Sequence, residues 1–213
     1  MSYSVKEIYY TLQGEGARAG RAAVFLRFTG CNLWSGREQH RASAVCRFCD
    51  TDFVGTDGPG GGRFASAAAL ADAVAERWPA AADGTPYIVC TGGEPLLQLD
   101  TAAINALHAR GFEIGVETNG TLPAPAGIDW ICVSPKAGSR VVQRSGDELK
   151  LVFPQTEREA QPENFTDWAF SHFYLQPLDS ELREQHTRDV IDYCLLHPRW
   201  KLSLQTHKLT GIA

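Results

Sequence analysis

Residues 23–52, AVFLRFTG followed by CNLWSGREQHRASAVCRFCDTD, decide the fold that this sequence predicts. Residues 23–29 are mostly apolar and include a β-branched residue, which is typical of a buried strand, and Gly30 ends that strand. Three cysteines follow in the spacing C-x14-C-x2-C, namely Cys31, Cys46 and Cys49. The first of them lies at the C-terminal tip of the predicted strand, where parallel α/β folds place their active-site residues.

The presence of three cysteines limits the kinds of metal centre that this loop can hold. A structural zinc site takes four ligands. A 4Fe–4S cluster is usually held by four cysteines as well, so three cysteines leave one iron open for another ligand. A Cys3His zinc site, with His40 as the fourth ligand, is the second interpretation, and the spacing of this loop does not separate the two.

Two further features favour iron and sulfur. Phe48 lies inside the last cysteine pair, and Thr91-Gly92-Gly93-Glu94-Pro95 follows the apolar run 87–90. Three thiolates with an aromatic between the last two, together with Gly-Gly-Glu-Pro after a strand, resemble the radical S-adenosylmethionine (SAM) enzymes. The usual spacing in that superfamily is C-x3-C-x2-C, from which the first gap of this chain departs.

The sequence YYTLQGEG over residues 9–16 points to one family within this superfamily. Together with the long cysteine gap and Cys49-Asp50-Thr51, it is similar to the 7-carboxy-7-deazaguanine synthase family, and the likeness spans nearly the whole chain. The resemblance implies a lyase of queuosine (7-deazapurine) biosynthesis. SAM on the open iron would be cleaved to a 5′-deoxyadenosyl radical and later regenerated. The substrate, 6-carboxy-5,6,7,8-tetrahydropterin, would contract its ring and lose ammonia to give 7-carboxy-7-deazaguanine.

Several polar motifs follow predicted strand tips, and one rim of a barrel is the expected place for an active site. By the resemblance, the cofactor-binding residues are Phe48, Gly92, Gly93, Glu94, Glu117, Ser134, Pro135, Lys136, Gln176, Pro177, Leu178 and Asp179. The two glycines would let the backbone approach SAM, and a tight turn requires them equally well. The expected role of Glu94 is to support the site, and Glu117 either binds ribose hydroxyls or caps a turn.

Arg27 is the main candidate for binding the substrate. A charge inside an apolar strand needs an anionic partner, which is either the substrate carboxylate or an internal acidic side chain. The remaining substrate-binding candidates are Leu12, Gln13, Gly14, Glu15, Thr91 and the C-terminal Ala213. The resemblance also implies Mg²⁺ at Thr51, although Asp50 and Asp52 are the better ligands on chemistry alone.

Length and composition exclude several other classes of protein. The 213 residues are enough for one domain, and we expect residues 1–213 to form a single radical SAM domain with its cluster loop at residues 31–52. A net charge of −5 argues against a nucleic-acid-binding surface. The sequence predicts neither a membrane span nor a signal peptide, so we expect a cytoplasmic protein. We expect a homodimer. Three arginines of the loop either form a solvated face or dock a flavodoxin-type electron donor: Arg37, Arg41 and Arg47.

The sequence pattern predicts helices over residues 66–78, 100–110 and 180–196. It predicts strands over residues 23–29, 86–91, 113–118, 130–134, 148–153, 172–176 and 201–205. Alternating strands and helices imply a parallel sheet. A complete (β/α)8 barrel usually needs about 250 residues, so we expect an incomplete TIM barrel with six to seven parallel strands and about three good crossover helices. Residues 57–62, DGPGGG, read as a flexible connection.

Two alternatives remain open on the sequence alone. One is a radical SAM activase that forms a glycyl radical on a partner protein, which would not need Arg27 with Gln13 and Glu15. The other is a non-catalytic binding module stabilised by zinc. No general base can be assigned from the sequence.

Overall fold

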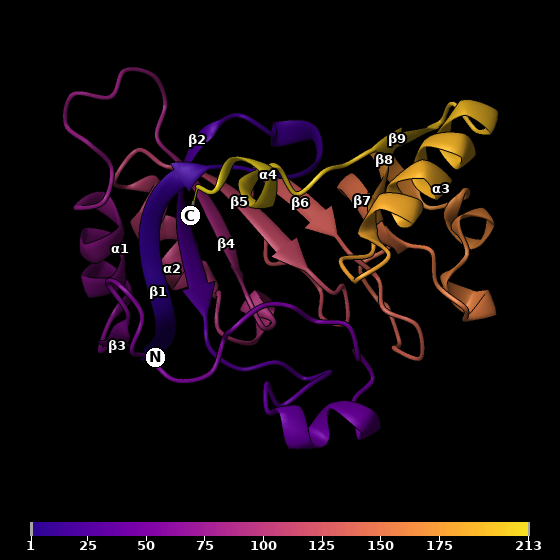
Figure 1. Cartoon of the computed structure of the whole chain (residues 1–213). Helices are drawn as coiled ribbons and strands as arrows, with labels where there is room; N and C mark the ends of the chain where they lie inside the picture. The colour runs from indigo at the N-terminus through magenta and orange to yellow at the C-terminus, as the bar shows by residue number, and fades with distance from the viewer. Residues whose placement is uncertain (1, 213) are drawn as a thin grey trace.

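The computed structural model describes residues 2–212, which form one open sheet of nine strands in the order β3-β1-β2-β4-β5-β6-β7-β8-β9 (Figure 1). The strands are β1 (Tyr3–Leu12), β2 (Ala22–Phe28), β3 (Gly62–Phe64), β4 (Tyr87–Gly92), β5 (Glu113–Thr118), β6 (Trp130–Val133), β7 (Ser145–Phe153), β8 (Ala169–Pro177) and β9 (Trp200–Leu202). From β2 to β9, leaving out β3, neighbouring strands pair in parallel. These seven parallel strands confirm the predicted incomplete barrel.

Three helices connect the parallel strands where the sequence predicts them: α1 (Ala67–Ala75), α2 (Thr101–His108) and α3 (Arg183–Leu196). The side chain of Ser66 accepts a hydrogen bond from the backbone of Ala69, and Asp100 does the same for Ala103. These N-caps satisfy backbone groups that the first helical turn leaves unpaired. The helices are shorter than predicted, and a fourth, α4 (Thr206–Thr210), follows β9.

The alternation of side chains along the strands separates a helix-covered face from a concave face. In β2, Val24, Leu26 and Phe28 join a buried cluster with α1 and α2. A second cluster joins α3 to the other end of the sheet. Because successive side chains of a strand point to opposite faces, the alternate residues of β2, which include Arg27, face the concave side.

Two strands were missing from the sequence prediction. β1 pairs antiparallel with β2, and β3 pairs antiparallel with β1. The alternation of Tyr3 and Val5 with polar neighbours is the signal for β1. The segment predicted as a flexible connection, residues 57–62, lies against β1, because Gly58 donates a backbone hydrogen bond to Lys6 and Pro59 accepts one from Ile8.

The C-terminal segment crosses the concave side of the open sheet. Beyond β9 the chain returns to the loop after β1, as the yellow ribbon in Figure 1 shows. There the backbone N–H and the hydroxyl of Thr206 both donate to the carbonyl of Gly14, at 3.0 and 2.9 Å. This return path brings residues from both ends of the sequence to one site. Among residues 2–212, no helix has the length and apolar character needed to cross a membrane.

Candidate active site

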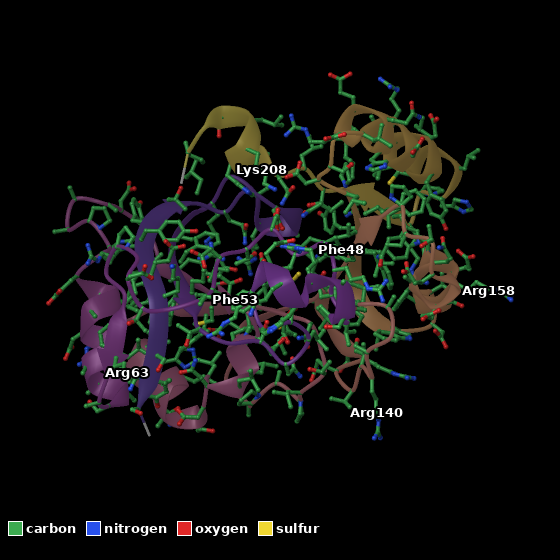
Figure 2. All side chains as sticks on the ribbon, turned by 60° about the horizontal axis from the view of Figure 1, so that its bottom comes forward. Phe48, Phe53, Arg63, Arg140, Arg158 and Lys208 are labelled. Carbon is green, nitrogen blue, oxygen red and sulfur yellow. The ribbon has the colours of Figure 1, made fainter. Side chains whose placement is uncertain are left out.

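The concave side of the sheet holds a cavity of about 450 Å³. Its size is typical of sites for small molecules and cofactors. Phe48 and Phe53, which contribute to its lining, lie in the inner part of the molecule in Figure 2, and Lys208, which also lines it, lies beside α4, whereas Arg140 and Arg158 lie at the periphery. Most of the predicted site residues therefore meet in one place.

The predicted residues that line the cavity are Leu12, Gln13, Gly14, Glu15, Arg27, Cys31, Cys46, Phe48, Cys49, Thr51, Thr91, Gly92, Gly93, Glu117, Ser134, Lys136, Gln176, Pro177, Leu178 and Asp179. Glu94 and Pro135 are buried and are not among the lining residues. Ala213 lies outside the described residues. Strand alternation explains the convergence, because Arg27, Glu117 and Gln176 come from three strands whose neighbouring residues pack against the helices.

The three cysteines of the loop line one part of this cavity. A hydrogen bond from the Cys46 thiol lowers the pKa of Cys49 to about 6, while burial raises the pKa of Cys31. The backbone N–H of Leu33 donates to the sulfur of Cys31 at 3.4 Å. The three cysteines are therefore grouped at one part of the cavity wall.

The donor set around these cysteines fits an anionic iron–sulfur cluster. Trp34 also lines the cavity, and its indole N–H is buried without a hydrogen-bond partner among the described residues. A buried unpaired donor costs free energy unless a bound group satisfies it. His40, the zinc alternative, is exposed and contacts Ser35 at 2.8 Å instead of the cavity. Within residues 2–212, no three His, Cys, Asp or Glu side chains gather around a single-ion position.

Arg41 stabilises the conformation of the cluster loop. Its guanidinium lies 4.1 Å from the ring centre of Trp34 and donates to the backbone carbonyls of Arg47 and Cys49, at 2.9 and 3.0 Å. It also pairs with Glu38. Arg41 therefore orders the loop that carries the last two cysteines, a role that its position in the sequence did not indicate.

Close backbone packing explains the glycine pair at the end of β4. A Cβ atom at Gly92 would lie 2.1 Å from the carbonyl oxygen of Phe28, and one at Gly93 would lie 2.1 Å from that of Gly30. Both clashes are with the strand that leads to Cys31. Only glycine at these two positions allows the end of β4 to pack this closely against the chain before Cys31. This packing supports the expectation that a tight turn requires both glycines.

We expect Gly93→Ala to lower the free energy of unfolding by about 1–3 kcal/mol, as overpacked substitutions do. It should also lower the amount of iron–sulfur cluster bound, because the added methyl group displaces Gly30 next to Cys31. Chemical denaturation and iron analysis measure these two effects. Gly84→Ala is the control for iron content alone, because no atom lies within 4 Å of its added Cβ but its φ of +92° strains any side chain and lowers stability without touching the cluster loop. Equal iron contents in the two variants would contradict the prediction.

Glu94 has a supporting role inside the fold. Its carboxylate accepts hydrogen bonds from the Thr118 hydroxyl at 2.8 Å, the Asn119 N–H at 2.8 Å and the Leu96 N–H at 2.9 Å. Burial raises its pKa. The carboxylate therefore joins the turn after β4 to the end of β5, and both of these chain segments contribute to the cavity.

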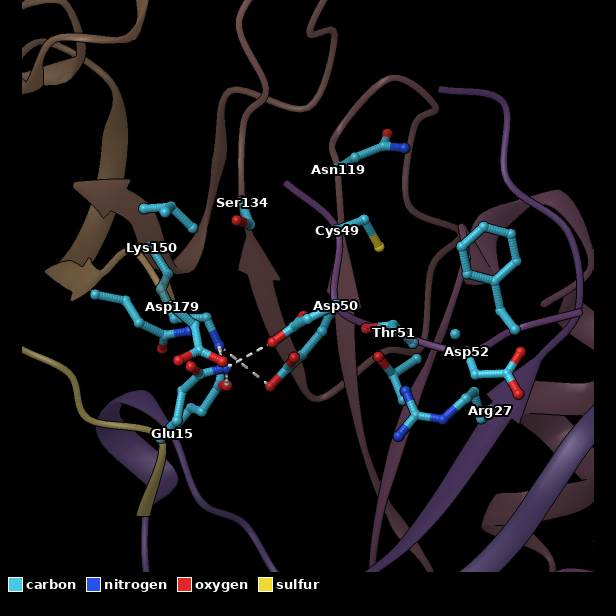
Figure 3. A pocket seen from close by; sticks show the side chains of 18 of the residues that line it. Glu15, Arg27, Cys49, Asp50, Thr51, Asp52, Asn119, Ser134, Lys150 and Asp179 are labelled. Carbon is cyan, nitrogen blue, oxygen red and sulfur yellow. Dashed lines mark hydrogen bonds and ion pairs between the residues drawn. The ribbon is translucent and has the colours of Figure 1, made fainter. Parts of the chain in front are cut away.

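Arg27 has an acidic partner within the protein. Its Nε atom lies 2.7 Å from Oε1 of Glu7, and its terminal nitrogen donates to the hydroxyl of Tyr9 at 2.9 Å. Burial opposes the charged form, but Tyr9 and Glu7 outweigh it and raise the pKa of Arg27. The guanidinium also lines the cavity (Figure 3). Arg27 therefore forms an internal ion pair and is still accessible to a ligand in the cavity.

The two aspartates that flank Thr51 are held by lysines. Asp52 lies 2.9 Å from the amino group of Lys6. Asp50 pairs with Lys208, which also lies 2.6 Å from Asp179. Thr51 lies between the two aspartates in Figure 3, and its hydroxyl makes no hydrogen bond to the described residues. The carboxylates are thus occupied by lysines while the hydroxyl has no protein partner in the described chain.

Sequence reasoning missed Lys150, which lies on the concave face of β7. Its amino group donates to Oε2 of Glu15 at 2.6 Å and lies 3.4 Å from Oε1 of Glu117. The Gln13 side-chain amide donates to the same Glu117 oxygen at 2.9 Å. The sequence could have predicted this position, because residues 148–151, Glu-Leu-Lys-Leu, alternate charged and apolar side chains. Such alternation in a strand places the charged residues on the face opposite the leucines, as it does for Arg27 in β2.

The open parallel sheet and the three-cysteine cavity define the radical SAM class of enzymes. A model described as the Radical SAM superfamily matches residues 39–148 of the chain. Proteins named 7-carboxy-7-deazaguanine synthase from Caulobacter vibrioides and Bordetella pertussis are 65% and 64% identical to it, each over 100% of both chains. A crystal structure of QueE from Escherichia coli aligns with a TM-score of 0.71 and 26% identity, covering 96% of this chain and 94% of that one.

The chain therefore belongs to the 7-carboxy-7-deazaguanine synthase family of radical SAM enzymes. Membership implies a 4Fe–4S cluster and SAM as its cofactors. It also excludes the zinc-stabilised binding module considered from the sequence.

Proposed function

We propose that this chain converts 6-carboxy-5,6,7,8-tetrahydropterin to 7-carboxy-7-deazaguanine, as a carbon–nitrogen lyase of 7-deazapurine and queuosine biosynthesis. One ammonia leaves, which balances the reaction. The observation that carries the proposal is a single cavity lined by three loop cysteines and by the polar set Gln13, Glu15 and Arg27. The full-length likeness to proteins named for this product supports it.

In this proposal Cys31, Cys46 and Cys49 hold the cluster and leave one iron for SAM. When bound, the reduced cluster and SAM supply the radical that removes hydrogen from the substrate. The residues that surround SAM are Phe48, Gly92, Gly93, Glu117, Ser134, Lys136, Gln176, Pro177, Leu178 and Asp179, with Glu94 and Pro135 behind them. Lys136 donates to the hydroxyl and carbonyl of Ser134, at 2.7 and 2.6 Å, which orders the turn after β6.

The substrate carboxylate binds Arg27, whose planar guanidinium suits a carboxylate. Gln13 and Glu15 face the donor groups of the pterin ring. Leu12, Gly14, Thr91 and the terminal carboxylate of Ala213 complete the proposed substrate site. Mg²⁺ binds at Thr51, which the pairing of Asp50 and Asp52 with lysines supports, since Mg²⁺ keeps several waters and takes few protein ligands.

The proposed oligomeric state, cellular compartment and electron donor are based on the similarity to this family. The chain acts as a single domain and as a homodimer in the cytoplasm, and it takes electrons from a flavodoxin-type donor. The exposed Arg37 and Arg47 on the cluster loop support docking of an acidic donor, whereas Arg41 is engaged within the loop.

The test is anaerobic incubation of the reconstituted protein with SAM, reductant and the carboxytetrahydropterin, followed by mass spectrometry. We expect a product lighter than the substrate by one ammonia, and no such product when SAM is left out. Recovery of unchanged pterin from protein that carries a full cluster and cleaves SAM would refute the proposed substrate.

A further inference from the structure

Lys150 is a buried cation at the centre of an acidic cluster on the concave face. Its side chain is 6% exposed, and the paired side chains of Glu15 and Glu117 are 14% and 25% exposed. Leu149 and Leu151, its neighbours in β7, belong to the buried cluster under α3. The alternation of the strand therefore forces Lys150 into the cavity wall, where an unpaired charge would be costly.

The network around Lys150 joins four parts of the chain. Lys150 contacts Glu15 of the loop after β1 and Glu117 of β5, as given above. The side-chain amide of Gln205, after β9, donates to the second oxygen of Glu15 at 3.2 Å. Glu15 and Lys150 are labelled on the same side of the cavity in Figure 3. Both oxygens of Glu15 are thus held, and each keeps a second lone pair for a ligand.

We propose that Lys150 is a positioning residue, which holds Glu15 as an ionised acceptor for the N–H groups of the pterin ring. The inference rests on the proposed function and deepens it, because it assigns the recognition of the ring donors to a pair of residues. A carboxylate accepts from two adjacent N–H donors, whereas a protonated carboxyl group presents a donor of its own to one of them.

The electrostatics of the cluster support this role. Burial raises the pKa of Glu15, but Lys150, together with Gln205 and His207, outweighs burial and brings the pKa below its ordinary value. The other groups that face this pair are Glu117 of β5, Cys132 of β6, Glu148 of β7 and His207 of α4. Burial lowers the pKa of Lys150, but Glu117, Glu15, Cys132 and Glu148 together outweigh burial, so that the pKa lies well above the ordinary value. Removing the lysine would leave burial as the dominant effect on Glu15.

The main experiment measures the affinity for the carboxytetrahydropterin with Lys150→Gln. Calorimetry under anaerobic conditions, on protein loaded with cluster and SAM, gives Kd at pH 6.5, 7.5 and 8.5. Buried glutamates reach pKa values of about 8, so Kd at pH 6.5 should be about 30-fold weaker than in the wild type and nearly restored at pH 8.5. The wild type and Lys201→Met, a change at an exposed lysine of β9, should show no such dependence.

Two further variants keep the inference testable if Lys150→Gln folds poorly. Lys150→Arg retains the charge on a larger, planar head group, so any loss of affinity should be the same at all three pH values. Lys150→Gln combined with Glu15→Gln should bind weakly at every pH. A loss of affinity in Lys150→Gln that does not change with pH, or a loss in Lys150→Arg that does, would overturn the proposal.

A second measurement separates this inference from the proposed function, because it uses no substrate. A carboxyl group whose pKa is raised by folding binds more protons in the native state, so stability falls as pH rises. The Tm of Lys150→Gln should therefore fall between pH 6.5 and 8.5 relative to that of the double variant. A constant Tm difference would overturn the role of Lys150, whereas a wild type that fails to bind the pterin would refute the proposed substrate alone.

Discussion

Replacing Cys46 with alanine is expected to remove the cluster and, with it, all cleavage of SAM. Three thiolates hold the cluster in this proposal, so loss of one leaves two ligands for four irons, which is too few for a stable 4Fe–4S site. We expect iron and sulfide contents below about a tenth of the wild-type values after anaerobic reconstitution. Iron analysis, the visible absorption spectrum and formation of 5′-deoxyadenosine measure the result.

Cys194→Ala is the matched control, because Cys194 lies partly buried in α3 and packs against the hydrophobic core between that helix and the sheet, away from the iron–sulfur site. It should keep the full iron content and the visible spectrum. Circular dichroism of both variants checks that the fold is intact. A Cys46→Ala protein that retains a complete cluster would show that Cys46 is not a ligand and that the three-cysteine site is wrongly assigned.

Replacing Arg27 with alanine is expected to weaken binding of the carboxytetrahydropterin by about 2–5 kcal/mol, the usual cost of removing one partner of a buried charge pair. The guanidinium is 17% exposed and borders the cavity, so the substrate carboxylate would lose its main cationic partner. The cluster should remain, because Arg27 is not a ligand. Anaerobic calorimetry of the loaded protein measures the change in Kd.

Glu7 complicates the Arg27 experiment and also supplies its control. Arg27→Ala leaves the carboxylate of Glu7 without its partner at 2.7 Å, and a stranded charge would itself repel an anionic substrate. Combining Arg27→Ala with Glu7→Gln removes that repulsion. We expect the double variant still to bind more than tenfold more weakly than the wild type. Restored affinity in the double variant would show that Arg27 serves the internal ion pair and that the carboxylate binds elsewhere.

The sequence allowed the class of the site to be predicted because its chemistry is local. Three cysteines after a strand, and Gly-Gly-Glu-Pro after the next one, lie on short segments whose ends must meet at one edge of a parallel sheet. The starts of the first two predicted helices were right for the same reason, since Ser66 and Asp100 cap their own helices, whereas α3, which has no side-chain N-cap, begins at Arg183 instead of residue 180. The antiparallel strands were harder to predict, because β3 at the edge of the sheet pairs with β1, whose residues lie about sixty positions earlier in the chain.

The sequence by itself determined the parallel strands, their helices, the three cysteines and the family. Only the tertiary structure decided which partners the charged residues take: Arg27 with Glu7, Lys208 with Asp50 and Asp179, and Lys150 with Glu15 and Glu117. Strand periodicity states which face a side chain occupies. It does not state which side chain from a distant segment reaches the same point, since that depends on the curvature of the sheet and on the return of the C-terminal segment across it.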